Sequence, residues 1–139
     1  KWPVSEGGER YRRGMYIFFK RTVPYPMLIS FDAPDSSVSC SRRERSNSPL
    51  QALTLLNDPV FFECAEVLGK QFIGKEPSSA IQEMFHRCVG RIASKQELHA
   101  LTRAHRELAS LNSRDAKSIH PMIGIARIIM NLDEFITRD

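Results

Sequence analysis

The 139-residue chain is poor in the residues and motifs that mark several protein classes. Its only cysteines, Cys40, Cys64 and Cys88, lie far apart and form no CxxC or CxxCH motif. No HExxH motif is present, and His99 and His105, six residues apart, would lie on different faces of a helix. The usual ligand spacings of a metal site and the motif for covalent haem attachment are therefore missing, and we expect no metal in this chain. Cys64 and Cys88 are expected to be small core residues on helices.

Long apolar runs are also missing. The most apolar stretch of the N-terminal part, residues 15–31, is interrupted by two basic residues and two prolines, whereas a membrane span needs about 20 predominantly apolar residues. The first residue is Lys1 rather than Met, and no charged-then-apolar leader follows it. We therefore expect no membrane span and interpret the chain as a piece of a longer protein.

Composition indicates a soluble, mildly basic single domain. Hydrophobic residues make up 42% and charged residues 26%, which is too apolar for a disordered chain. Residues 1–48 hold 9 basic and 5 acidic residues, and residues 49–139 hold 11 of each, so the net charge of +4 arises entirely in the first third. We expect residues 1–48 to form a basic, aromatic arm and residues 49–139 a helical bundle, together as one domain.

The arm is expected to be ordered. Residues 9–21 predict one short helix, with Tyr11, Met15 and Phe18 on one face. The two prolines that follow restrict the residue before each to extended backbone, and residues 31–37 (FDAPDSS) are typical of a turn. Six large aromatic residues are too many to leave exposed, so we expect some to pack on the bundle and the rest to form an interface. The six are Trp2, Tyr16, Phe18, Phe19, Tyr25 and Phe31.

The remaining residues predict helices. Apolar periodicity is clearest over residues 81–92, 98–111 and 122–136, and the last of these is apolar almost all round, as expected of the central helix. Short connections favour antiparallel neighbours, and no alternating stretch indicates a sheet. The predicted fold is all-α: an irregular four- to five-helix bundle preceded by an extended, proline- and aromatic-rich arm.

Helix starts are marked by local signals. Pro49 suits a first helical turn, and Asp58 before Pro59 is typical of a cap. Two further helices are expected to begin at capping boxes, one formed by Ser79 with Gln82 and the other by Ser94 with Glu97.

Polar residues near the first of these helix starts form the candidate site. Clustered arginines beside free helix N–H groups could bind an anion or a sugar. The alternative is an anchoring role, in which the arginines tie the arm to acids of the bundle. The candidate residues are Arg42, Arg43, Arg45, Asn47, Gln51, Asn57, Asp58, Asp133 and Glu134.

The anchoring alternative makes a specific prediction. Asp133 and Glu134 are expected near the C-terminal end of the last helix, where the helix dipole disfavours negative charge, so a cationic partner should lie close by. We expect at least one of the three arm arginines to contact Asp133, Glu134 or Asp58. Arginines that instead converge on an open pocket would favour an anion site.

Several stretches resemble one family. The segments RRGMYIFFKRTVPYP, FDAPD, SCSRRERSNSPLQALTLLNDPVF and NLDEFITRD resemble a planctomycete-specific C-terminal domain of unknown function. The resemblance implies a place at the end of a large exported protein that often carries an upstream cytochrome c domain. It implies an extracytoplasmic location, periplasmic or exported, and haem held by the upstream domain, with no cofactor in this chain. It supplies no reaction and no catalytic residues.

Three functions remain open. A non-catalytic interaction or structural module, with the upstream domains or a second copy as its partner, fits the aromatic arm and the lack of a recognisable catalytic motif. Nucleic-acid or anion binding by the arm arginines is an alternative, although a net charge of +4 is small for a nucleic-acid-binding domain. A part in a polysaccharide-processing enzyme is the third, because paired carboxylates can hydrolyse glycosides.

Overall fold

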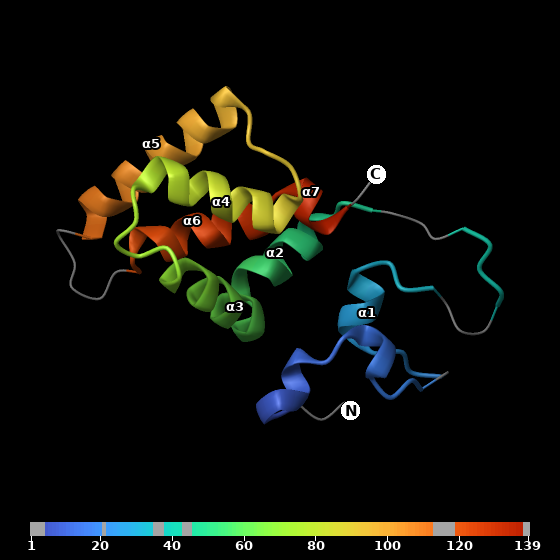
Figure 1. The fold of residues 1–139 in the computed structure, drawn as a ribbon. Coiled ribbons are helices and arrows are strands. Elements are labelled where there is room, and N and C mark those ends of the chain that lie inside the picture. Colours follow the sequence, from blue (N-terminus) through green and yellow to red (C-terminus); the bar gives the residue numbers. More distant parts are fainter. Residues whose placement is uncertain (1–4, 21, 35–37, 43–45, 113–118, 138–139) are drawn as a thin grey trace. The chain divides into compact units, whose positions relative to one another are not determined.

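The computed structural model describes residues 5–20, 22–34, 38–42, 46–112 and 119–137. Within these ranges it contains seven α-helices and two 3-10 helices and no strand, which confirms the predicted all-α class (Figure 1). The chain divides into two compact units, residues 1–54 and 55–139. In the described part, no helix is both long and apolar enough to cross a membrane.

The first unit is built from short helical pieces. It contains the 3-10 helices Gly7–Tyr11 and Gly14–Tyr16, the helix α1 (Pro26–Ser30) and the first part of α2 (Pro49–Asn57). The predicted helix over residues 9–21 is therefore wrong over its described residues. Extended backbone at the two residues before Gly14, with ψ values of 135° and 144°, separates the two 3-10 helices.

Proline and glycine explain this difference. Gly14 disfavours a continuous helix, and a Cβ at this position would lie 2.7 Å from Cδ2 of Leu28, so a larger residue would have to displace the Leu28 side chain. Tyr25 has the extended backbone predicted for a residue before proline. Pro26 then starts α1, a helix that was not predicted, because proline is well suited to the first helical position.

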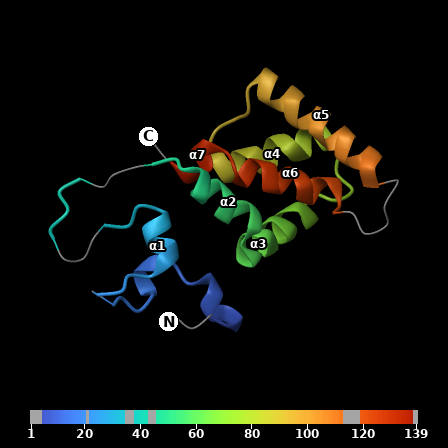
Figure 2. The same ribbon diagram turned by 180° about the vertical axis from the view of Figure 1, so that it is seen from behind.

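The second unit is a helical bundle. It contains α3 (Pro59–Lys70), α4 (Pro77–Val89), α5 (Lys95–Asn112), α6 (Pro121–Met130) and α7 (Asp133–Ile136). Helix α6 packs against α3, α4 and α5, and Figure 2 shows it running between α3 and α5. Most residues of α6 are buried, which confirms its predicted central position. Fully buried core side chains include Phe72, Ile81, Met84, Phe85, Ile125 and Ile129.

Three of the four predicted helix starts are confirmed and one is wrong. Helix α2 begins at Pro49, as predicted, and α5 begins directly after Ser94. Asp58 Oδ1 accepts from the backbone N–H of Val60 at 2.8 Å, as a cap before Pro59 should.

Helix α4, however, begins at Pro77 rather than after a Ser79 cap. The carboxylate of Glu76 caps the helix by accepting from the backbone N–H groups of Ser78 and Ser79. Pro77 occupies the first helical position, where a missing N–H costs nothing.

The last predicted helix is interrupted. Helix α6 ends at Met130, and α7 begins at Asp133, so residues 122–136 do not form one helix. Leu132 between them has extended backbone, with φ −75° and ψ 148°. Asp133 and Glu134 therefore lie in the first turn of a new helix, where negative charge is favourable, and not at the end of an old one.

Close helix contacts depend on two glycines. A Cβ on Gly69 of α3 would lie 2.7 Å from the backbone Cα of Ile123 in α6. A Cβ on Gly124 of α6 would lie 2.6 Å from Cδ1 of Leu108 in α5. Helix α6 therefore lies in close contact with both α3 and α5.

Candidate functional site

A polar network around Asp32 organises the first unit. Asp32 follows α1 and has a φ of 56°, a left-handed conformation that aspartate tolerates better than most residues. Its Oδ2 accepts from the backbone N–H of Ser46 at 2.7 Å, and the Ser46 hydroxyl lies 2.8 Å from both carboxylate oxygens. The Nε2 of Gln51 also donates to Asp32, at 3.2 Å. The turn at 31–34 is thereby joined to the residues that precede α2.

Gln51 has a second role as part of a capping box at the start of α2. The Ser48 N–H donates to Oε1 of Gln51 at 3.0 Å, and the Gln51 N–H donates to the Ser48 hydroxyl at 3.3 Å. The spacing S-x-x-Q was present in the sequence but was not used as a signal. Gln51 is the buried polar side chain of the described core, and its amide groups are satisfied by Ser46, Ser48 and Asp32. This arrangement fits a structural role for the network.

The other predicted site residues that the structure describes belong to different elements of the chain. Asn47 is exposed, Asn57 is the last residue of α2, and Asp58 caps α3. Arg42 is exposed, and Arg43 and Arg45 lie outside the described residues. The contact of an arm arginine with an acid of the bundle, and the alternative of an anion pocket, both stay predictions.

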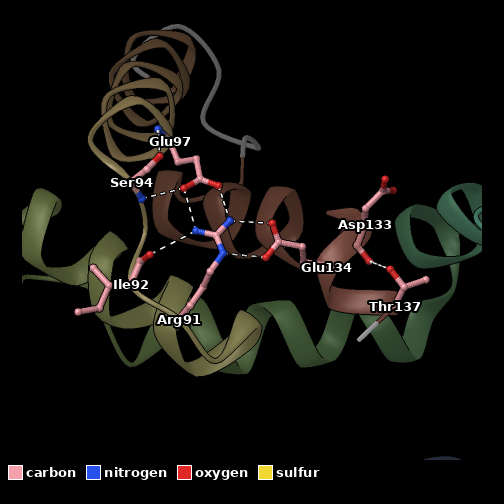
Figure 3. A network of polar contacts seen from close by, with 7 residues as sticks. All are labelled: Arg91, Ile92, Ser94, Glu97, Asp133, Glu134 and Thr137. Carbon is pink, nitrogen blue, oxygen red and sulfur yellow. Dashed lines mark hydrogen bonds and ion pairs between the residues drawn. The ribbon is translucent and has the colours of Figure 1, made fainter. Parts of the chain in front are cut away.

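The second polar network joins residues far apart in the bundle (Figure 3). Arg91, just after α4, donates to Glu134 of α7 through Nε at 2.8 Å and through Nη2 at 2.7 Å. It also donates to Glu97 of α5 through Nη2 at 2.6 Å and through Nη1 at 3.0 Å. The remaining Nη1 donor reaches the carbonyl of Ile92 at 3.2 Å. We call Arg91, Glu97 and Glu134 the arginine clamp.

A capping box supports the clamp. The Ser94 N–H donates to Glu97 Oε2 at 2.7 Å, and the Glu97 N–H donates to the Ser94 hydroxyl at 3.3 Å, as predicted. Glu97 is thus held in place by the start of α5 while it binds Arg91. Arg91 also lies over the Phe85 ring, 5.0 Å from its centroid.

The charges of the clamp stabilise one another. Hydrogen bonds from Arg91 and then from Ser94 lower the pKa of Glu97 to about 2. The Arg91 guanidinium also lowers the pKa of Glu134, and the two carboxylates, Glu97 first, raise the pKa of Arg91. All five N–H donors of Arg91 are occupied within the chain, so the clamp offers no donor to an anionic ligand. Its arrangement fits a structural role.

The expected cationic neighbour of Glu134 exists, but it is Arg91. Sequence reasoning missed this residue because 43 positions separate the partners, and no local rule links them. One sequence signal was available for the contact with Glu97. Arg91 lies three residues before Ser94, at the capping box that Ser94 forms with Glu97.

The cysteines are free thiols. Cys40 and Cys64 are exposed and Cys88 is partly buried. Cys88 packs against the core, as predicted, whereas the exposed position of Cys64 on α3 contradicts the prediction. Burial raises the pKa of both helical thiols, and at Cys64 the nearby acids, Glu63 and then Asp58, raise it further. Among the described residues, no three His, Cys, Asp or Glu side chains are grouped so that they could hold a metal ion.

Several basic residues of the arm contact their own neighbours. The Arg10 guanidinium lies 5.6 Å from the Tyr11 ring centroid, and the Arg13 guanidinium 5.5 Å from that of Tyr16. Arg12 pairs with Glu9 at 2.6 Å. The apolar side chains next to them are exposed: Met15, Tyr16, Phe18 and Phe19. Tyr25 and Phe31 are partly buried, and Trp2 lies outside the described residues.

Comparison with known proteins gives one match. A family model, PSD1, described as a protein of unknown function (DUF1553), matches residues 1–105. No curated protein and no solved structure matches the chain. The matched range runs from the arm into α5, so it contains the Asp32 network, Arg91 and Glu97, whereas Glu134 lies beyond it.

Proposed function

Because the chain belongs to the DUF1553 family of proteins of unknown function, we propose that it is a non-catalytic helical module that docks onto the rest of a larger protein. The proposal includes the context that the sequence resemblance implies: a planctomycete protein that is exported and carries an upstream cytochrome c domain. Neighbouring sequence in the parent protein tests this context directly. A CxxCH motif upstream would support it, and a parent protein with no such motif would contradict the cytochrome association.

One observation carries the docking proposal, the exposure of residues 15–19 (MYIFF), which we call the aromatic segment. Met15 is 73% exposed and Phe18 is 72% exposed, and Tyr16 and Phe19 beside them are also exposed. Contiguous large apolar side chains on a soluble surface are typical of a binding interface, and aromatic residues are common among its strongest contacts.

The neighbouring charges support a protein partner over an extended nucleic acid. Arg13 already lies over the ring of Tyr16, and Arg12 is paired with Glu9, so both cations are engaged within the chain. Methionine, as at position 15, adapts its shape to a partner surface but does not provide a ring on which bases stack. The partner that we propose is the remainder of the same polypeptide.

The test is a binding measurement between this chain and the remainder of its parent polypeptide. The double variant Met15→Ser/Phe18→Ser removes the two most exposed side chains of the aromatic segment. Ile92→Ser is the matched control, because Ile92 is also 73% exposed but lies between α4 and α5. Calorimetry should show binding by the original chain and the control, and binding about tenfold weaker or worse by the double variant.

Other outcomes would contradict the proposal. Equal affinity for the original chain and the double variant would show that the aromatic segment is not the interface. A dimer of the chain alone that the double variant abolishes, measured by light scattering, would make a second copy the partner. Salt-dependent binding of single-stranded DNA that needs the aromatic segment would favour the nucleic-acid alternative.

A further inference from the structure

Two arginine–tyrosine pairs lie at the start of the aromatic segment and just before it. Each of the two 3-10 helices ends at the tyrosine of one pair. Nη2 of Arg10 lies 3.5 Å from the hydroxyl of Tyr11. Nη2 of Arg13 lies 3.3 Å from the hydroxyl of Tyr16. In both pairs the guanidinium also lies over the ring of its tyrosine, so this stretch places a cation at each of two exposed aromatic side chains.

The Arg13 guanidinium keeps its charge in this arrangement. The ring of Tyr16 is uncharged, so the contact holds the arginine side chain in place without neutralising it. Arg12 differs, because it is paired with the carboxylate of Glu9 at 2.6 Å. Arg13 is exposed, and a guanidinium presents several donors in one plane, which suits a carboxylate. Arg13 is therefore well placed to bind a carboxylate of a partner.

Positive charge borders the aromatic segment at both ends. Arg13 lies two residues before Met15, and Lys20 directly follows Phe19, and both basic side chains are exposed. Residues 5–20 hold four basic and two acidic residues, whereas residues 49–139 hold 11 of each. Across an interface, opposite charges favour association and like charges disfavour it. The surface that matches this border is therefore acidic where the two meet.

The acidic residues of the same stretch restrict the kind of partner. Glu6 and Glu9 are exposed, so this surface carries negative as well as positive groups. A phosphate backbone or an anionic lipid surface presents negative charge throughout its area of contact and would repel both carboxylates. A protein surface can place its carboxylates opposite the cations alone. The mixture of charges therefore favours a protein.

We infer that the surface that receives the aromatic segment is apolar at its centre and acidic at its rim, and that one of its carboxylates pairs with Arg13. The inference rests on the proposed function, which makes the remainder of the same polypeptide the partner. The apolar contacts supply most of the affinity, while the charges fix the orientation and speed association. The pair with Arg13 forms at the edge of the interface, where dissolved salt weakens it.

Calorimetry with the remainder of the parent polypeptide at two salt concentrations tests the inference. The original chain should bind several-fold more weakly at about 300 mM than at about 50 mM sodium chloride, because salt screens charges at the rim. Arg13→Gln should bind about threefold more weakly or worse at low salt, and its affinity should depend less on salt. Arg13→Lys keeps the charge and should retain most of the affinity. The control, Arg103→Gln, removes an exposed cation from α5 and should bind like the original chain.

The outcomes separate this inference from the proposed function. Binding that needs Met15 and Phe18 but is the same at both salt concentrations and in Arg13→Gln would overturn the acidic rim and leave the docking interface intact. An Arg13→Lys variant as weak as Arg13→Gln would overturn it too, since the contact with Tyr16 and not the charge would then matter. Binding to vesicles of phosphatidylcholine and phosphatidylglycerol that Arg13→Gln abolishes would replace the protein surface by a membrane. Absence of binding by the original chain would overturn both proposals.

Discussion

Arg91 and Glu134 form a bidentate pair, in which Nε and Nη2 of the guanidinium each donate to one carboxylate oxygen, at 2.8 and 2.7 Å. The pair connects the loop after α4 with α7, and Glu97 joins the start of α5 to the same guanidinium. Helix α7 has only four residues and is too short to be stable alone. The arginine clamp is therefore a polar contact that ties the last described helix to the rest of the bundle.

Loss of the clamp should release α7. Arg91→Met keeps the apolar stem of the side chain but removes every hydrogen bond to Glu97 and Glu134. We expect faster amide hydrogen exchange in residues 133–137, where the Thr137 N–H donates to the carbonyl of Asp133 at 2.8 Å. Arg103→Met is the control, since Arg103 pairs with Glu107 of the same helix, at 3.7 Å. Equal exchange in both variants would show that α7 does not depend on Arg91.

Local sequence rules predicted the helical elements because their causes are local. The cap at Asp58 and the capping box of Ser94 with Glu97 each involve residues within three positions of one another. The apolar periodicity of α6 likewise predicted its burial. The same rules overlooked Glu76, because glutamate is an uncommon cap and Ser79 offered a more familiar one.

Long-range contacts could not be predicted in this way. Nothing near Arg91 in the sequence specifies Glu134 as its partner, and the pairing depends on where α7 begins. The break between α6 and α7 was not predicted either. Asp133 was expected near the C-terminal end of a helix, where its charge is unfavourable, but it lies in the first turn of α7, where its charge is favourable. In the arm, Gly14 and its close neighbour Leu28 outweighed the helical spacing of the apolar residues.

Ile129 should contribute strongly to the stability of the bundle. Its side chain is 0% exposed in the centre of α6, so Ile129→Ala leaves a cavity and should cost about 2–5 kcal/mol of unfolding free energy. Ile128 is the next residue of the same helix but is 39% exposed, and Ile128→Ala should cost less than about 1 kcal/mol. Urea denaturation measures both. Similar losses in the two variants would contradict the central position of this face of α6.

The close contact between α3 and α6 should not tolerate a side chain at Gly69. Gly69→Ala would place a methyl group 2.7 Å from the Cα of Ile123, and backbone cannot move aside as a flexible side chain can. We expect a loss of about 1–3 kcal/mol in unfolding free energy, although alanine favours helix formation. Gly8→Ala is the control, because nothing lies within 4 Å of its Cβ position. A Gly69→Ala variant more stable than the original chain would contradict the packing of these two helices.

The charge on Glu97 should stabilise the bundle over a defined pH range. Arg91 and Ser94 lower the pKa of Glu97 to about 2, from an ordinary value near 4.5. Its contribution is therefore complete above about pH 4.5 and is lost as the pH falls through about 2. Glu97→Gln retains an acceptor for the Ser94 N–H and removes only the charge.

This variant should unfold at lower urea concentration than the original chain at pH 7, and the difference should disappear near pH 2. Glu107→Gln, in the same helix but paired with Arg103 at 3.7 Å, should change the midpoint little at either pH, because exposed pairs contribute little. A difference between Glu97→Gln and the original chain that stays constant from pH 7 to about pH 2 would mean that the amide disturbs packing. The stabilisation would then not come from the charge that Glu97 presents to Arg91.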